Sequence, residues 1–290
     1  LGLTLGVTLL FVTLIVLLPL IGLGWQFARL GASDYLRVMG DPRVLASLRV
    51  TISAAAAATL VNAAGGLLLA WVITRYRFAG RGVLDALIDL PFALPTSVAG
   101  IALVALYAKD GWIGGLLAPF GLTPAYTWWG IVIAMAFTSI PFAVRAIQPL
   151  IEELDAAEEA AARTLGASDG QIFARVILPH LMPGILTGTG LSFVRSLGEF
   201  GAVIFIAGNL PFKTEIASLL IMIRLDEFDY PAAAAIAGTM LLLSLALLHD
   251  VVPLEPGVPL PQWLRHLPFA IPAVLIQCAA EEIAFRGYLM

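Results

Sequence analysis

Long uncharged runs, separated by short charged segments, set the pattern of hydrophobic and polar positions along this chain of 290 residues. A helix needs about 20 apolar residues to cross a hydrocarbon core of about 30 Å. The pattern therefore predicts an all-α polytopic membrane protein with six transmembrane helices, while a seventh run at 267–280 is short for a crossing. The six runs cover residues 1–28, 50–74, 90–108, 128–144, 176–194 with an extension past Arg195, and 230–248.

The composition supports an integral membrane protein and excludes other classes. Hydrophobic residues make up 60% of the chain and charged residues 12%, against about 45–50% and about 25% in soluble domains. The only lysines are Lys109 and Lys213, and no GxxxxGK[ST] phosphate loop is present, so the chain hydrolyses no nucleotide by a P-loop route. The single cysteine excludes an internal disulfide and argues against a thiol-based metal site. No basic cluster suggests nucleic acid, and the arginines and lysines leave the membrane orientation open.

A charged, alanine-rich segment at 152–179 separates the fourth and fifth apolar runs. It is rich in helix formers but too polar to enter lipid. Gly166 supplies a left-handed position that ends one helix, and Ser168 with Gln171 forms a capping box that starts another. Pro179 and Pro183 bracket the return to the membrane. The segment therefore predicts a short helical hairpin outside the bilayer; the alternative is an ordinary solvated loop.

The spacing within this hairpin resembles the EAA-x3-G-x9-I-x-L-P loop of ABC-importer permeases. In that family the loop docks in a cleft of the ATP-binding subunit and carries its motion to the spans. The resemblance therefore implies an ATPase-coupling loop, although Ala160 stands at the usual glutamate position, with Glu159 one place earlier. The matching positions are Ala161, Ala162, Gly166, Val176, Leu178 and Pro179.

Three longer segments widen the resemblance over nearly all of residues 1–248. The stretches 89–103, 140–155 and especially 195–238 resemble the T-type permease of sulfate/thiosulfate importers. The SLGEFGA part of the third stretch is similar to molybdate permeases as well, so a molybdate/tungstate importer is the alternative. The continuation KTEIASLLIMIRLDEFDYPAA favours sulfate.

This resemblance implies a fold, a location and a set of partners. The expected fold is the type I ABC-importer permease, with six spans and both chain ends inside, in contact with lipid of the bacterial cytoplasmic (inner) membrane. The expected partners are an ATP-binding cassette subunit, a second permease subunit and a periplasmic sulfate-binding protein. ATP and Mg²⁺ would bind to the ATPase, so the chain itself is expected to be neither an enzyme nor a cofactor carrier.

Two charges, Arg195 and Glu199, fall in or beside the fifth predicted span. They stand one helical turn apart, so one interpretation is an ion pair within the helix that neutralises itself. Ionisable groups at membrane depth also commonly face a bundle interior or an aqueous path. The second interpretation is that Arg195 presents positive potential to a passing oxyanion, as part of a gate or pathway.

The two ends of the chain carry separate expectations. The first run lacks a starting Met, a basic leader and a small-residue cleavage site, which predicts a span of an N-terminally trimmed chain rather than a signal peptide.

Residues 279–290 resemble the first motif, E-E-x-x-x-R, of the CAAX-protease and bacteriocin-processing membrane proteases, with Glu281 as the base candidate and Arg286 as its organiser. The alternative is a Glu282–Arg286 pair on an interfacial helix. We expect residues 1–249 to form the permease and 250–290 to be an appended, catalytically silent fragment, with the protease-like part starting at about 253.

Overall fold

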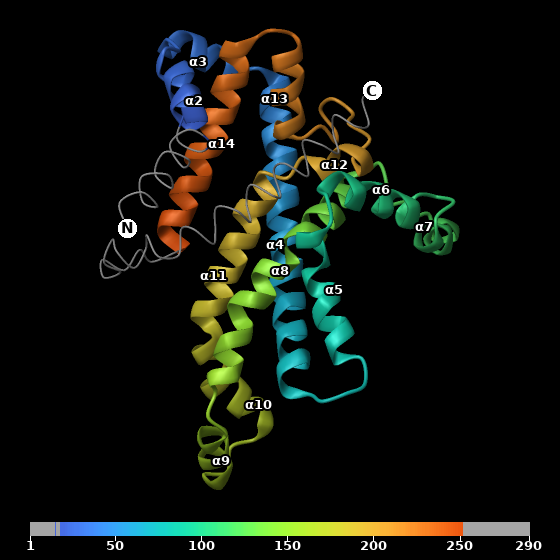
Figure 1. The fold of residues 1–290 in the computed structure, drawn as a ribbon, viewed down its shortest axis with the longest axis vertical. Helices are drawn as coiled ribbons and strands as arrows, with labels where there is room; N and C mark the ends of the chain where they lie inside the picture. Colours follow the sequence, from blue (N-terminus) through green and yellow to red (C-terminus); the bar gives the residue numbers. More distant parts are fainter. Residues whose placement is uncertain (1–14, 16–17, 252–290) are drawn as a thin grey trace, which may run out of the picture.

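The computed structural model describes residue 15 and residues 18–251, with side chains as far as 247, and this part of the chain is all-α (Figure 1). The elements in order are α2 (Leu18–Ala28), α3 (Ala32–Met39), α4 (Pro42–Arg75), α5 (Arg81–Ala93), α6 (Thr96–Tyr107), α7 (Trp112–Leu117), η2 (Ala118–Phe120), α8 (Trp128–Glu153), α9 (Ala156–Thr164), α10 (Asp169–Ile172), η3 (Phe173–Ile177), α11 (Leu178–Leu197), α12 (Gly201–Ile206), α13 (Ala217–Asp226) and α14 (Tyr230–Val251).

Five helical segments in the described part of the chain are long and apolar enough to cross a membrane. They are Pro42–Arg75, Thr96–Phe120, Trp128–Glu153, Asp169–Leu197 and Tyr230–Leu247. These segments overlap the second to sixth predicted runs. The shorter apolar helix α2 is the end of the first run, whose earlier part lies outside the described residues.

The prediction of one uninterrupted span over 90–108 is wrong, because the helix breaks at Leu94 and Pro95. A residue that precedes proline is pushed toward extended backbone, and Leu94 adopts φ −89° and ψ 134°. Helix α5 therefore ends at Ala93, and α6 begins at Thr96. The break leaves the first turn of α6 inside the molecule, next to α12.

The expectation that proline stands at a helix start on the return to the membrane is confirmed for Pro179, which lies in the first turn of α11. Residues 169–197 run as one helical segment in which five residues, Phe173–Ile177, take the wider π-helical form. Proline lacks the N–H of a normal helical bond and its ring crowds the preceding turn. The π-turn just before Pro179 accommodates it, with the Leu178 N–H donating to the Phe173 carbonyl, and Pro183 lies inside α11.

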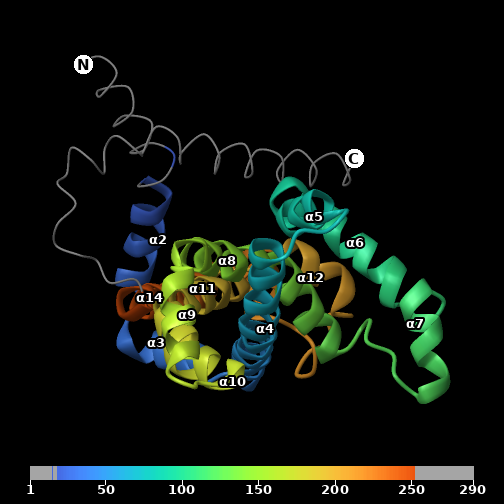
Figure 2. The ribbon, with the colours of Figure 1, turned by 90° about the horizontal axis from the view of Figure 1, so that it is seen from below.

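Helices α4, α8 and α11 cross at the centre of the molecule, with α2, α3 and α14 on one side and α5, α6 and α7 on the other (Figures 1 and 2). Small residues permit the close crossing, as they do in membrane helix bundles. A Cβ on Gly66 of α4 would lie 2.7 Å from the Ala143 Cβ of α8. A Cβ on Gly188 of α11 would lie 3.0 Å from the Ala143 Cα. Three helices therefore meet around one alanine.

Buried hydrogen bonds join the same three helices. The Asn62 side-chain amide of α4 donates to Ser139 Oγ of α8 at 2.8 Å and to Ser192 Oγ of α11 at 2.9 Å. Ser139 Oγ also lies 3.0 Å from Ser196 Oγ, near the end of α11. All four side chains are buried. Polar side chains that find partners across helices stabilise a bundle in lipid, and here they fix α11 against its neighbours.

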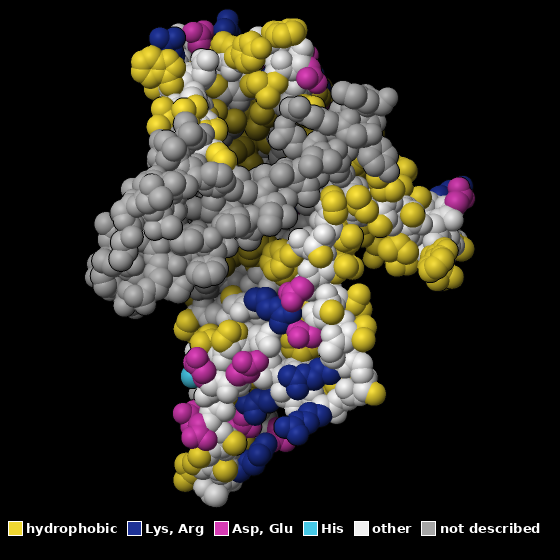
Figure 3. Space-filling view, in the orientation of Figure 1, with side chains coloured by type: hydrophobic (Ala, Val, Ile, Leu, Met, Phe, Trp, Pro, Cys, Tyr) yellow, Lys and Arg dark blue, Asp and Glu magenta, His cyan; other side chains and the backbone are white. Residues whose placement is uncertain are grey.

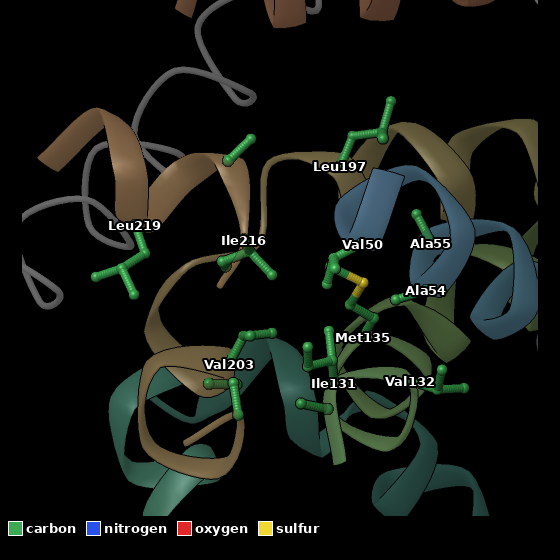
Figure 4. Close-up of a cluster of buried hydrophobic side chains, with 14 of the residues drawn as sticks. Val50, Ala54, Ala55, Ile131, Val132, Met135, Leu197, Val203, Ile216 and Leu219 are labelled. Carbon is green, nitrogen blue, oxygen red and sulfur yellow. The ribbon is translucent and has the colours of Figure 1, made fainter. Parts of the chain in front are cut away.

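Two hydrophobic clusters lie at different levels of the bundle. The first cluster joins α4 and α8 to α12, α13 and the end of α11, with Met135, Leu197 and Ile216 among its members (Figure 4). The second cluster lies toward α9 and α10 and contains Ile73 of α4 and Ile147 of α8. Ile172 and Ile177 belong to it as well, so the base of the predicted hairpin is packed into the bundle.

Candidate functional site

The hairpin at 152–179 forms by local backbone rules. Asp155 begins α9, with a carboxylate oxygen that accepts the Ala157 N–H at 2.8 Å. After α9 ends, Gly166 adopts φ +83°, a left-handed conformation that favours glycine. Ser168 then starts α10 with the predicted capping box, in which Ser168 Oγ accepts the Gln171 N–H and Gln171 Oε1 accepts the Ser168 N–H. Both predicted signals of the turn are confirmed.

Side-chain contacts attach both arms of the hairpin to the end of α4. Arg75 Nη2 lies 2.6 Å from Glu159 Oε1 of α9. The guanidinium of Arg75 also stacks over Trp71, 5.0 Å from the ring centroid. Trp71 in turn meets Phe173, on the second arm, edge to face at 6.0 Å. Glu159 therefore has an internal partner in spite of its shift by one place. No residue pattern had indicated Arg75 as that partner.

The predicted coupling positions divide into two sets. Glu159, Ala162, Val176 and Leu178 are half-buried, and Ala162 and Val176 pack against the second cluster. Ala161, Gly166 and Pro179 are exposed. The first set therefore holds the hairpin, and the second set presents a surface.

Leu165 is a position that sequence reasoning missed. It lies at the tip of the hairpin with 88% of its surface exposed. The end of the molecule that carries α9 and α10 is rich in charged side chains of both signs (Figure 3). A large apolar side chain exposed among charged groups is typical of a contact surface for another protein.

Arg195 and Glu199 form the predicted ion pair, with Arg195 Nη1 and Glu199 Oε2 2.8 Å apart. Glu199 lies beyond the end of α11, in the link to α12, and its side chain is 1% exposed, against 25% for Arg195. Glu199 Oε1 accepts the Ala202 N–H at 3.0 Å. The other oxygen, Oε2, accepts no well-aligned hydrogen bond, so its interaction with Arg195 is an ion pair without a directed hydrogen bond. Glu199 is thus held from two directions.

A cavity of about 100 Å³ lies beside this ion pair. The first turn of α6 supplies Thr96 and Ser97 to its wall, and the start of α12 supplies Gly201. Sequence reasoning missed Thr96 and Ser97, because about one hundred residues separate them from Arg195. The other residues that line the cavity are Arg195, Gly198, Glu199 and Phe200.

The protease-like residues Glu281, Glu282 and Arg286 lie outside the described residues, so their interpretation stays a prediction. The same applies to the proposed boundary near residue 250 and to the fragment that would start at about 253.

Apolar helices long enough to span a membrane, together with a polar helical hairpin at one end, are typical of the membrane component of a transporter. The sequence model described as "Binding-protein-dependent transport system inner membrane component" matches residues 62–252, and the chain belongs to this family.

Within this family, the chain is similar to proteins named for one kind of cargo. It is 54% identical over 253 residues to the sulfate transport system permease protein CysT of Escherichia coli (strain K12), covering 87% of this chain and 91% of that protein. It is 46% identical over 242 residues to the CysT protein of Synechocystis sp. (strain ATCC 27184 / PCC 6803 / Kazusa), covering 83% of this chain and 85% of that protein.

Solved structures show the same fold at low sequence identity. A chain of a bacterial ABC transporter involved in the import of the acidic polysaccharide alginate matches with a TM-score of 0.66 and 17% identity, covering 86% of this chain and 93% of that chain. A chain of an amino acid ABC transporter with histidines matches with a TM-score of 0.53 and 20% identity, covering 79% and 100%. The expected ABC-importer permease fold is therefore confirmed.

Proposed function

We propose that this chain is the membrane-spanning permease subunit of an ATP-driven importer of sulfate or thiosulfate in the inner membrane. The observation that carries the proposal is the 54% identity to the CysT protein of Escherichia coli over 91% of that protein's length. Its partners are an ATP-binding cassette subunit, a second permease subunit and a periplasmic sulfate-binding protein. ATP and Mg²⁺ bind to the ATPase, and this chain supplies the path.

The hairpin end faces the cytoplasm in this proposal and docks with the ATPase. Two features support a docking role: the exposed Leu165 at the tip and the rigid base formed by the Arg75–Glu159 pair. The exposed residues Ala161, Gly166 and Pro179 border the docking surface. Val176 and Leu178 connect this surface to the bundle.

A single helical segment supports transmission of motion from the hairpin to the pathway. Residues 169–197 form 29 continuous helical residues, which span about 43 Å at about 1.5 Å per residue. This segment begins at the hairpin and ends two residues after Arg195. A displacement of the hairpin by the ATPase therefore moves the segment that carries Arg195, while the Arg75–Glu159 contact moves α4 with it. Arg195 and Glu199 border the anion's path.

Uptake of radioactive sulfate tests this function. Cells that lack their own sulfate import, and that express this chain with its partner subunits, are expected to accumulate ³⁵S-sulfate in an energy-dependent way. Excess thiosulfate is expected to compete, whereas excess molybdate is not. Competition by molybdate alone would point instead to the molybdate/tungstate importer.

Removal of the tail tests the proposed division of the chain. We propose that residues 1–249 carry the transport function and that 250–290 are dispensable. Deletion of 253–290 and, separately, Glu281→Ala are both expected to leave sulfate uptake intact. Peptide cleavage by the purified chain that depends on Glu281 would contradict this division.

A further inference from the structure

Two hydroxyl groups in the cavity beside Arg195 have no protein partner among the described residues. Thr96 is only 6% exposed, yet its hydroxyl makes no hydrogen bond within that part of the chain, and the half-buried Ser97 hydroxyl makes none either. Neither hydroxyl oxygen is fully enclosed by protein, so both can form hydrogen bonds with water or a ligand in the cavity. The same cavity is lined by Arg195, whose guanidinium makes one ion pair within the described chain, from Nη1 to Glu199. Two hydroxyl groups without a protein partner and the remaining N–H groups of Arg195 therefore belong to the wall of one cavity.

Gly201 packs directly against the first turn of α6, which carries both hydroxyl groups. A Cβ at Gly201 would overlap the Thr96 hydroxyl and would lie 3.2 Å from the Ser97 backbone N. Any larger residue would therefore clash with the first turn of α6 and displace it. The first N–H groups of a helix lack partners within the helix, and the positive end of its dipole favours anions. The start of the twelve-residue helix α6 adds to the positive character of Arg195.

We propose that Thr96, Ser97 and Arg195 form a transient contact site for a tetrahedral oxyanion on its way through the permease. The hydroxyls and the guanidinium donate hydrogen bonds to separate oxygens of the anion, and all three are neutral or positive donors that a dianion requires. This inference rests on the proposed sulfate function and deepens it by assigning residues that select the anion.

Glu199 limits the strength of this site. Its buried carboxylate compensates the charge of Arg195, while Oε1 accepts the Ala202 N–H. A transport pathway must bind its cargo well enough to admit it and weakly enough to release it. A fully uncompensated arginine would hold a dianion too long. The pair therefore sets a low affinity, which suits passage rather than storage.

The backbone around Arg195 is fixed by its neighbour. Ser196 turns to the opposite side and contacts Ser139 of α8 at 3.0 Å, and Ser139 accepts a hydrogen bond from Asn62 of α4. Arg195 is thus presented to the cavity by a rigid end of α11. We expect the donors to keep their spacing while the site is empty.

Removal of the two hydroxyls tests the site in the complete transporter, reconstituted in vesicles with its ATPase, second permease and binding protein. The double variant Thr96→Val and Ser97→Ala keeps the side-chain volumes close to those of the wild type. We expect the number of sulfate ions imported per ATP hydrolysed to fall by about three- to tenfold, the size expected for lost hydrogen bonds to a charged group. The matched control is Thr187→Val, which removes a hydroxyl from α11 on the wall of a separate, apolar groove. It is expected to keep the wild-type ratio.

A second variant tests the role of Glu199, and here we expect sulfate binding to become tighter rather than weaker. Glu199→Gln keeps an oxygen for the Ala202 N–H but removes the charge that compensates Arg195. Binding of ³⁵S-sulfate by the purified complex without nucleotide is expected to tighten by about tenfold or more, while maximal uptake falls because release slows. Adding Thr96→Val and Ser97→Ala to this variant is expected to reverse the tighter binding, which a merely structural role of Glu199 would not produce.

The outcomes separate this inference from the proposed function. A wild-type complex that imports sulfate, together with a double hydroxyl variant that keeps the wild-type ratio of sulfate to ATP, overturns the contact site and leaves the function standing. Unchanged sulfate binding in Glu199→Gln overturns the role of Glu199. A wild-type complex that imports no sulfate overturns both the function and the site.

Discussion

The hairpin and the cavity beside Arg195 are built in opposite ways, although one helical segment joins them. The hairpin is made by sequence neighbours, each of its helix caps joins residues at most three apart, and its charged groups are largely exposed. The cavity combines residues 96–97 with 195–201, and its acidic group is buried. In the proposed function the hairpin docks with the ATPase and moves, and local caps allow it to keep its shape when the helices around it shift. A selective path needs donors held in place by a packed bundle.

The contrast extends to the ion pairs of the two regions. The contact between Arg75 and Glu159 joins two partly exposed side chains and can re-form after a small displacement. The contact between Arg195 and Glu199 includes a carboxylate with 1% exposure, which loses more if its partner leaves. We therefore expect changes in the hairpin to affect coupling, and changes in the cavity to affect passage and stability together.

The largest expected effect is that of Gly166→Val in the hairpin. The positive φ of Gly166 is strained for any side chain and most for a β-branched one. We expect the variant to insert and assemble but to lose more than about tenfold of sulfate-dependent ATP hydrolysis, because the turn can no longer present α9. The matched control is Gly170→Val, since a Cβ at Gly170 meets nothing within 4 Å and the backbone there is helical. Normal coupling in Gly166→Val would remove the hairpin from the mechanism.

The second effect concerns Arg195→Ala in the cavity. Breaking a buried ion pair by removing one partner costs about 3–5 kcal/mol, and we expect less here because Arg195 is partly exposed. Uptake should fall more than the yield of assembled complex, as measured on the same preparation. The double variant Arg195→Ala and Glu199→Ala removes the unpaired charge. If it restores full uptake, the pair is structural and Arg195 has no part in the path.

A smaller effect is expected when the hairpin is detached from α4. Glu159→Gln weakens a partly exposed ion pair, for which about 0.2–1 kcal/mol is typical. We expect sulfate-dependent ATP hydrolysis to fall by about two- to fivefold. Glu158→Gln is the matched control, because Glu158 is exposed and has no ion pair in the described chain. Exchange of the two charges, Arg75→Glu with Glu159→Arg, should recover part of the loss; equal effects of Glu158→Gln and Glu159→Gln would contradict the anchoring role.

The smallest effect is that of Ser168→Ala at the start of α10. Loss of a capping side chain costs about 1 kcal/mol of local helix stability. Faster amide hydrogen exchange at residues 169–172 is expected, with sulfate uptake close to that of the wild type because the other anchors remain. Unchanged exchange would show that packing of Ile172, rather than the cap, holds this turn.

Local rules explain which parts of the fold and site could be predicted from the sequence. The spans follow from apolar length, and the hairpin turn follows from Gly166 and the Ser168 cap. The proline at position 95 is a local signal for the helix break, but the run of 90–108 contains no charge and was therefore interpreted as one span. The helix continues through Pro179 because a π-turn precedes this proline, and no residue pattern predicts a π-turn.

Residues brought together by packing could not be predicted in the same way. Thr96 and Ser97 become part of the cavity only because α6 packs against α12, which places them next to Gly201. Arg75 likewise becomes relevant only when α9 folds back toward α4 and offers Glu159. The ion pair of Arg195 and Glu199 was predictable because its members are four residues apart, but the burial of Glu199 was not.

The sidedness of ATP-driven sulfate transport is the sharpest test of coupling between the hairpin and the pathway. Vesicles containing the assembled transporter would receive sulfate-loaded binding protein on one face and ATP with Mg²⁺ on either face, and the orientation would be marked by protease access to the hairpin. We expect ³⁵S-sulfate to move toward the hairpin side, and only when ATP is present on that side. Transport driven by ATP on the opposite side, or movement of sulfate away from the hairpin, would contradict this coupling.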